Sequence, residues 1–174
     1  MKNKGFTLIE LVVVIVILGI LAVTAAPRFM NMQVDARNSA LQAMKGAMTS
    51  GMEMGYGILA MNGLEATPLL NKDVPVAGCE KTSCDFRYGY PAADTLTLPV
   101  LVDALGDHTK RDDWAIVFIH GQDDLQGPSI TITQRDNVYR EGQQSKLVNN
   151  NCFIRYYRKT QNDIPYRLEI TPCQ

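Results

Sequence analysis

The sequence has no surplus of either charge. Its 17 lysines and arginines stand against 18 aspartates and glutamates over 174 residues, which gives a formal net charge of −1. A chain that binds nucleic acid needs a surplus of positive charge to neutralise phosphates, so DNA and RNA are excluded as the main partner. The length corresponds to a single domain, which argues against a two-domain enzyme. Charge is also absent locally, because residues 11–26 contain no charged side chain.

Histidine is scarce, and the motifs of catalytic sites are missing. His108 and His120 are the two histidines, and neither belongs to an H-E-x-x-H pair, a nucleophile elbow or a phosphate-binding loop. The acidic pairs at 112–113 and 123–124 could ligate calcium, but their spacing does not fit an EF-hand loop. Solvated turns explain these pairs better. We therefore expect no enzyme activity, no cofactor and no metal site.

A long apolar run lies near the N-terminus. Residues 6–26 contain a single charge, and a membrane-spanning helix needs about 20 predominantly apolar residues. Lys2 and Lys4 precede the run and Arg28 follows it, so the flanking charges favour a cytoplasmic N-terminus only weakly. A cleaved secretory signal peptide is the alternative, with small residues at 22–26 as its cleavage site. The run is too long for that, and a proline would follow the cut bond, so we interpret it as a membrane-spanning helix.

Glu10 is the one charge within this apolar run. A carboxylate in the hydrocarbon region costs roughly 2.5 to 3.5 kcal/mol on insertion scales, so it indicates a function and requires a partner. No lysine, arginine or histidine lies within the run to neutralise it. The partner must come from another chain or from a new N-terminus made by processing. Cleavage between Gly5 and Phe6 would expose an α-amino group with an ordinary pKa of about 7.7 to 8.0, which a neighbouring subunit could present to Glu10.

The residues around Glu10 resemble the N-terminal signature of type IV pilins. The sequence K-G-F-T-L-I-E at residues 4–10 is followed by an uncharged apolar run. In that family a prepilin peptidase removes a short basic leader after the glycine, the new N-terminal phenylalanine is N-methylated, and the glutamate four residues later pairs with a neighbouring amine. The resemblance implies that Gly5 is the last leader residue, that Phe6 is the methylated N-terminus, and that Phe6 and Glu10 take part in assembly.

The periodicity predicts that the apolar helix continues well beyond a membrane. Apolar residues recur every three or four positions after Pro27, so we expect one helix from Phe6 to about Ala60. Pro27 lacks an N–H and should kink the helix, and Gly19 lowers helix propensity by about 1 kcal/mol relative to alanine. The stretch between them is then the weakest part of the helix, and the resemblance implies that it partly unwinds within a filament. The recurring residues form two rows, which we interpret as core packing with small residues that let a sheet approach: Phe29, Met32, Ala36, Ala40, Ala43, Ala47, Gly51, Met54 and Ile58 in the first, and Met30, Val34, Leu41, Met44, Met48, Met52 and Leu59 in the second.

The C-terminal part of the sequence predicts strands. Residues 62–113 are irregular, with four prolines and a short helix expected at about 99–105. Turn-forming residues then separate segments rich in β-branched and aromatic residues. The strand candidates are residues 114–120, 129–133, 152–157 and 166–171.

A long helix followed by strands suggests an α+β fold. We expect a four-stranded antiparallel sheet packed on the amphipathic half of the helix, which is also how pilins are built. The chain then divides into a leader (1–5), a membrane-spanning and assembly helix (6–27) and a globular domain (28–174).

Four cysteines lie beyond the membrane segment, on the side where disulfides form. They allow three pairings. Proximity favours Cys79 with Cys84, and a bond between Cys152 and Cys173 would tie the C-terminal strands together. Pilins commonly have such a C-terminal disulfide around a variable surface loop, which would expose residues 162–163. A zinc site is the alternative, but the spacings lack the C-x₂-C pattern.

Several patches resemble, more narrowly, the mannose-sensitive haemagglutinin pilins of marine gammaproteobacteria. They are residues 21–29, 88–93, 112–114 and 153–157. The likeness implies a major subunit of a surface pilus, a helical homo-oligomer for attachment to chitinous, mucosal or abiotic surfaces and for biofilm formation. The precursor would lie in the inner membrane, with prepilin peptidase and the pilus assembly machinery as partners, before export to the extracellular pilus.

Two other functions compete with this one. A pseudopilin of a type II secretion system would carry the same N-terminal signature, but two cysteine pairs and a long irregular region disfavour it. A membrane-anchored periplasmic enzyme is the more remote alternative.

Overall fold

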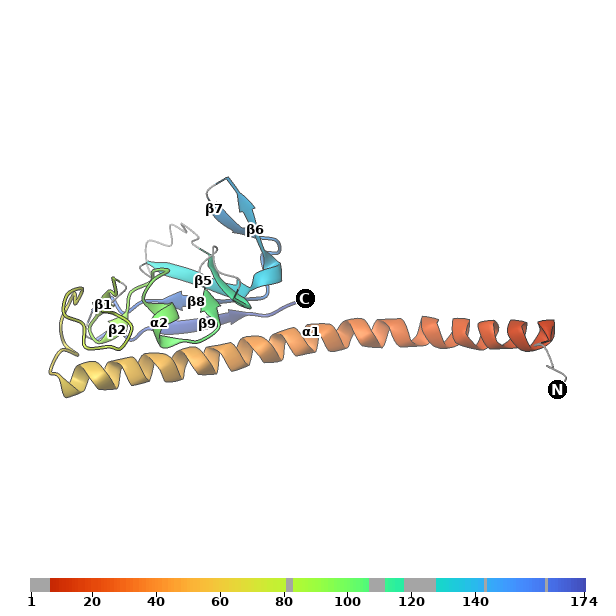
Figure 1. The fold of residues 1–174 in the computed structure, drawn as a ribbon, viewed down its shortest axis with the longest axis horizontal. Helices are drawn as coiled ribbons and strands as arrows, with labels where there is room; N and C mark the ends of the chain where they lie inside the picture. Colours follow the sequence, from red (N-terminus) through yellow and green to blue (C-terminus); the bar gives the residue numbers. More distant parts are fainter. Residues whose placement is uncertain (1–6, 81–82, 107–111, 118–127, 143, 162) are drawn as a thin grey trace, which may run out of the picture. The chain divides into compact units, whose positions relative to one another are not determined.

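The computed structural model describes residues 7–80, 83–106, 112–117, 128–142, 144–161 and 163–174. The chain forms two compact units, Met1–Arg37 and Asn38–Gln174. One long helix, α1, contributes to both units, and the described strands all belong to the second (Figure 1). Each unit therefore has its own architecture.

Helix α1 extends over Leu8–Met61, which matches the length that the periodicity predicts. It ends in a Schellman motif, in which the N–H of Gly63 bonds to the Ala60 carbonyl at 3.1 Å and the N–H of Leu64 bonds to the Leu59 carbonyl at 2.9 Å. Gly63 has a φ of +68°, which glycine adopts without a steric penalty. The helix thus ends where the chain must turn back toward the second unit's core.

In the second unit, α1 buries one of the two apolar rows. Ala43 and Ala47 of the first row are exposed, and Met54 of that row is 62% exposed. The sequence predicts both rows in the core, and this is wrong for most of the first row. A single layer of sheet and loops covers a stripe of the helix surface, and two rows together are wider than that stripe. The buried members of the second row are at most 6% exposed: Leu41, Met44, Met48, Met52 and Leu59.

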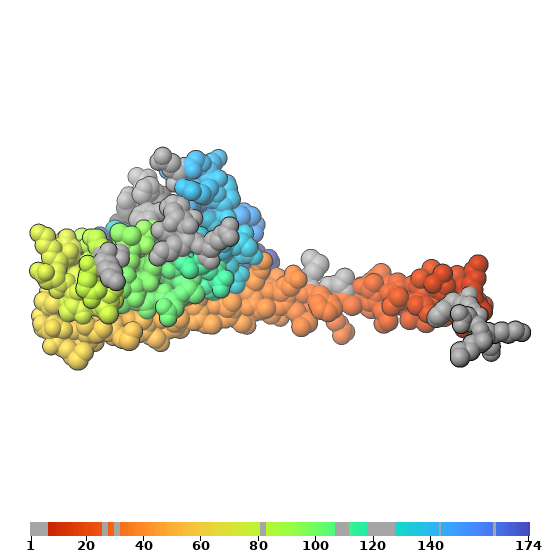
Figure 2. Space-filling view, in the orientation of Figure 1, coloured from red at the N-terminus to blue at the C-terminus, as the bar shows by residue number. Residues whose placement is uncertain are grey.

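Two glycines one helical turn apart let a second helix, α2 (Leu98–Leu101), approach α1 closely. A Cβ atom on Gly51 would collide with the Leu101 carbonyl group, and one on Gly55 would lie 3.1 Å from Leu101 Cδ2. Figure 2 shows this green part of the chain directly against the orange and yellow part of α1. The small residues of α1 therefore admit α2 at these positions. Helix α2 is also shorter than the 99–105 segment that we predict, because Val102 is already extended.

Within the described residues the main sheet has five strands, in the order β3-β4-β5-β8-β9. Strand β3 pairs in parallel with β4, and the other neighbours are antiparallel. The prediction of a four-stranded antiparallel sheet is therefore wrong, although the α+β class holds. The extra strand has two residues, too few for any alternating pattern to reveal it. The strands are β3 Leu105–Gly106, β4 Trp114–Val117, β5 Ser129–Gln134, β8 Phe153–Tyr157 and β9 Arg167–Thr171.

A row of isoleucines crosses four strands of this sheet. Ile116 pairs with Ile132, Ile132 with Ile154, and Ile154 with Ile170. The first three are at most 1% exposed. β-Branched residues opposite one another on a sheet face stabilise the pairing, so this row fixes the register of the sheet. Figure 1 shows the part of α1 that belongs to the second unit running along one face of the same sheet.

Two small hairpins complete the second unit. Strands β1 (Phe86–Arg87) and β2 (Tyr90–Pro91) are joined by Tyr88 and Gly89, whose φ angles are +48° and +81°. Two consecutive positive φ angles are typical of the two-residue turn that joins the strands of a tight β-hairpin. Strands β6 (Val138–Glu141) and β7 (Gln144–Leu147) form a separate ribbon after the short 3₁₀ helix η1, Arg135–Asn137. The sequence analysis predicts neither hairpin, since β1 and β2 have only two residues each and β6 and β7 contain several polar residues.

Candidate functional site

The N-terminal end of α1 is organised by a pair of side chains. The backbone N–H and the hydroxyl of Thr7 donate to Oε2 of Glu10, at 2.8 and 2.7 Å. The N–H of Glu10 donates back to Thr7 Oγ1 at 3.4 Å. This reciprocal arrangement is a capping box, in which each side chain satisfies a backbone donor that the first helical turn leaves unpaired. Both bonds to the carboxylate use Oε2, so Oε1 of Glu10 faces no donor from Thr7.

Thr7 is a site residue that the sequence analysis misses. The signal was available, because a threonine followed three residues later by glutamate at the start of an apolar run is the sequence pattern of a capping box. Gly5 and Phe6, the predicted cleavage and methylation residues, lie outside the described residues.

The apolar half of α1 is exposed among the residues that the structure describes. By length and composition the segment Leu8–Ala25 can cross a membrane, with a mean hydropathy of 3.0 and no part of it buried. Its large apolar side chains are between 43% exposed, at Val12, and 81% exposed, at Leu8. A surface of this extent requires lipid or other protein chains to cover it.

The predicted weak region keeps a helical backbone in the isolated chain. The helix continues through both Gly19 and Pro27. A Cβ atom on Gly19 would have no heavy atom within 4 Å, so packing does not require glycine there. Thr24 donates its hydroxyl to the Leu21 carbonyl at 3.0 Å, a bond that competes with the helical hydrogen bonds of this stretch.

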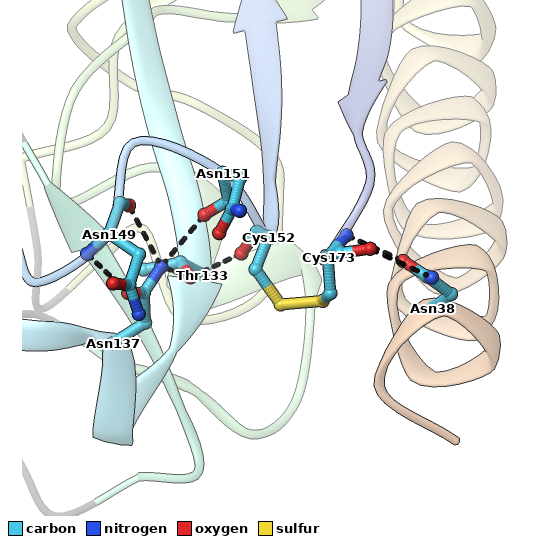
Figure 3. Close-up of a disulfide and its surroundings, with 7 residues drawn as sticks. All are labelled: Asn38, Thr133, Asn137, Asn149, Asn151, Cys152 and Cys173. Carbon is cyan, nitrogen blue, oxygen red and sulfur yellow. Dashed lines mark hydrogen bonds between the residues drawn. A yellow bond between two sulfur atoms is a disulfide. The ribbon is translucent and has the colours of Figure 1, made fainter. Parts of the chain in front are cut away.

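The second candidate site is the C-terminal disulfide, which lies between β8 and α1 (Figure 3). Cys152 is bonded to Cys173, and both are buried. Asn38 of α1 contacts the backbone of Cys173 twice: its Oδ1 accepts from the Cys173 N–H at 2.7 Å, and its Nδ2 donates to the Cys173 carbonyl at 3.4 Å. One amide side chain therefore attaches the end of the chain to the helix.

A hydrogen-bond network surrounds the other cysteine of this disulfide. Thr133 donates its hydroxyl to the Cys152 carbonyl at 2.7 Å. Asn137 Nδ2 donates to Thr133 Oγ1 at 3.1 Å and to the Asn151 carbonyl at 3.0 Å, and its Oδ1 accepts from the Asn149 N–H at 2.9 Å (Figure 3). Asn137 is buried, so these bonds offset the cost of removing its amide from water. Asn38 has no sequence signal because its partner is 135 positions away. Asn137 has none because its partners, 4 to 14 positions away, follow no recognised motif.

The first disulfide joins Cys79 to Cys84 in the irregular region. Cys84 packs with Leu59, Val76 and Phe86 in a small buried cluster. This bond therefore belongs to the core that follows the end of α1. Of the predicted variable loop, residue 163 is exposed and residue 162 lies outside the described residues.

Among the described residues, no three histidine, cysteine, aspartate or glutamate side chains come together as a metal site would require. The two histidines and the acidic pair at 123–124 lie outside these residues.

Comparisons with known proteins point to one family. The prokaryotic N-terminal methylation motif matches residues 1–26. The type IV narrow pilus major component PilA5 of Thermus thermophilus is 48% identical over 58 residues, which is 33% of this chain and 47% of that protein. The type IV major pilin protein PilA of Myxococcus xanthus is 32% identical over 127 residues, which is 58% of each chain.

These alignments set the scope of the likeness. The chain spans about half the length of the curated relatives it matches. No solved structure matches it significantly. Residues 1–26 thus match an N-terminal methylation motif, part of the chain is similar to two type IV pilins, and neither of these relatives is named as an enzyme.

Proposed function

We propose that this chain is a structural subunit of a type IV pilus. The observation that carries the proposal is the apolar helical segment Leu8–Ala25, which none of the described residues buries and which has one carboxylate at its N-terminal end. Such a segment needs one environment before assembly, the membrane, and another afterwards, the neighbouring subunits. The methylation motif and the two pilin relatives support the same function.

Glu10 would select and fix the neighbouring subunit. A prepilin peptidase would cut between Gly5 and Phe6, and the Phe6 amine, once N-methylated, would approach Glu10 of another subunit. Because Thr7 holds Oε2 of Glu10, the amine would bond to Oε1. An ion pair in an apolar interior is favourable only when both partners are present, so misplaced subunits would be disfavoured.

Repetition of this contact would produce a helical filament. The amine of one subunit and the carboxylate of the next are different surfaces, so the contact is heterologous, and it extends without limit when the rotation does not close a ring. In this proposal residues 1–5 are the leader, residues 6–27 form the membrane and filament-core segment, and residues 28–174 form the globular domain. The stretch from Gly19 to Pro27 is where the helix would partly unwind as subunits pack.

The precursor would sit in the inner membrane and the mature subunit in an extracellular pilus. The narrower proposal is a major subunit of the mannose-sensitive haemagglutinin type, which attaches cells to surfaces, including chitin, and supports biofilms. Its support is the sequence likeness at residues 21–29, 88–93, 112–114 and 153–157. Both relatives are also named as major components of their pili.

Two measurements test the proposal. Electron microscopy should show surface filaments on cells with this chain and none on cells that lack it, and mass spectrometry of sheared filaments should find an N-methylated Phe6 at the mature N-terminus. Gly5→Asp should leave uncleaved precursor in the membrane. An N-terminus at Met1 or Pro27 would contradict the processing. Loss of protein secretion with unchanged surface filaments would assign the chain to a type II secretion system instead.

A further inference from the structure

The β1–β2 hairpin meets the end of β8 at a point that the assembly function does not use. Tyr156 of β8 donates its hydroxyl to the Pro91 carbonyl of β2 at 2.6 Å, and Tyr156 is fully buried. In the hairpin, Arg87 pairs with Tyr90. The contact between Tyr156 and Pro91 therefore brings the hairpin that carries Arg87 next to the C-terminal end of β8.

Arg158 extends β8 past its last paired residue. Its N–H donates to the Pro128 carbonyl at 3.4 Å, which continues the pairing of Ser129 with Tyr157. Because side chains alternate along extended chain, Arg158 lies on the same face as Tyr156. That is the face toward the β1–β2 hairpin and Arg87.

The two arginines lack partners for buried donors. Both are half-buried, and the Nε atoms of Arg87 and Arg158 are shielded from water with no hydrogen-bond acceptor among the described residues. Partial burial, and secondly the positive charge of Arg87, lower the pKa of the Arg158 guanidinium. Two cations that lie close together in a partly desolvated place are unfavourable when no described carboxylate forms an ion pair with either. An unpaired buried donor in a native fold usually marks a missing ligand or water.

Aromatic rings and a third cation border this pair of arginines. Tyr90 stacks on Tyr56 with ring centroids 5.0 Å apart and contacts Tyr166 at 4.7 Å. Lys159 Nζ lies 5.4 Å from the centre of the Tyr90 ring. Tyr90 and Tyr166 both donate their hydroxyls to Glu53, at 3.2 and 3.1 Å, so this carboxylate is already engaged. The half-buried rings offer flat apolar surfaces beside three positive charges.

We propose that Arg87 and Arg158 bind the oxyanion of an acidic sugar, a carboxylate or a sulfate, with the tyrosine rings packing against the sugar. Guanidinium groups present forked N–H donors that match such oxyanions in geometry and charge. Nucleic acid fits less well, because it needs a longer track of cations and the whole chain has no positive surplus. Binding at this place does not require a filament, so it goes beyond the pilus function and is tested separately from it.

The test uses the full-length chain in detergent micelles and a matched pair of sugars. Trigalacturonic acid should raise the midpoint of thermal unfolding, and the neutral trisaccharide of galactose at equal ionic strength should not, because ligands that bind the folded state stabilise it. Arg87→Gln and Arg158→Gln should each weaken the apparent affinity by about tenfold or more, since each removes a charge-assisted hydrogen bond. Arg140→Gln, at an exposed position of β6, is the matched control and should bind as the unmodified chain does.

Three outcomes would overturn the proposal. Equal shifts of the unfolding midpoint with acidic and neutral sugars would show that the site does not recognise an oxyanion. If sodium sulfate reproduced the whole shift, the site would bind a free ion and not a sugar. A purely structural role for Arg158 would be seen in the unfolding midpoint measured without ligand. Without ligand, Arg158→Gln should leave the unfolding midpoint unchanged or raise it, because it relieves repulsion from Arg87, so a large drop would assign Arg158 to folding instead.

Discussion

The two halves of α1 both carry large apolar side chains, but these side chains have opposite surroundings. In the second unit, Met48 and Met52 are completely buried by other parts of the same chain. In the first unit, no part of the apolar segment Leu8–Ala25 is buried by the residues that the structure describes. The two halves of one helix therefore have different roles. The later half contributes to the core of the folded domain, and the earlier half needs lipid or another subunit to cover it. Stability and assembly should respond to different substitutions along the same element.

The largest effect should come from removing the uncovered half. A chain that begins at Arg28 lacks the apolar segment and Glu10 but keeps both disulfides and the sheet. We expect it to be soluble, folded and unable to polymerise, because the surface that drives association is gone. Size-exclusion chromatography and negative-stain microscopy measure this, with the full-length chain as the control. Long filaments of the truncated chain would show that the apolar half of α1 is not what drives assembly.

A single change within the uncovered half should separate insertion from assembly. Glu10→Val should insert into the membrane better, because it removes a buried acid, but should abolish or strongly reduce filament growth, because docking loses its ion pair. Membrane fractionation and filament counts measure the two effects. Val12→Leu, an apolar exchange in the same turn region, is the control and should assemble normally.

Thr7→Val sharpens the same experiment. It removes the hydroxyl bond to Glu10 but keeps the backbone bond, so a partial loss of filaments is expected. Normal filament numbers in Glu10→Val cells would disprove the proposed pairing.

The covered half should show a contrast between two methionines of the same helix. Met48→Ala should lower the free energy of unfolding by about 2 to 5 kcal/mol, because Met48 is 0% exposed and its loss leaves a cavity. Met54→Ala should change it by less than about 0.5 kcal/mol, because Met54 is 62% exposed. Urea unfolding of the chain that begins at Arg28 compares the two. Similar losses for both would mean that the exposed row also packs in the domain.

The smallest expected difference is between the two disulfides. On the chain-entropy account, replacing Cys152 and Cys173 by serine should cost about 3 kcal/mol, and replacing Cys79 and Cys84 about 2 kcal/mol, because the bonded residues are 21 and 5 positions apart. Unfolding of the two double variants gives the values. Peptide mapping that joined Cys84 to Cys152, or free thiols in the unreduced chain, would contradict the pairing.

The sequence predicts the parts of this molecule that depend on long periodic patterns. The extent of α1 follows from regular spacing, and strands β4, β5, β8 and β9 follow from runs such as Phe153–Tyr157. Strand β3 escapes prediction because a two-residue strand has no pattern, and its parallel pairing depends on where the chain returns. The exposure of the first apolar row of α1 could not be predicted, because the sequence shows that a residue is apolar but does not show which face of the helix the sheet will cover.

The candidate sites divide in the same way. Thr7 could have been predicted from its spacing to Glu10, since a capping box is local. Asn38 could not, because its partner Cys173 is 135 positions away and meets it only after the sheet has formed. Arg87 and Arg158 are ordinary surface residues in the sequence. Only the structure shows that the Nε atoms of both are buried without a hydrogen-bond acceptor.

The contact of Asn38 with Cys173 also defines a mechanical path. Tension that reaches the helix at Asn38 passes through two hydrogen bonds to Cys173, and from there through the disulfide to Cys152 at the start of β8. Strand β8 is hydrogen-bonded on both sides, to β5 and β9. The force is therefore shared by several hydrogen bonds that must break at the same time and not one after another. This path leaves out the covalent chain between the helix and β8. A stretched subunit should therefore resist extension through its last strand pair, and its irregular region should carry little of the force.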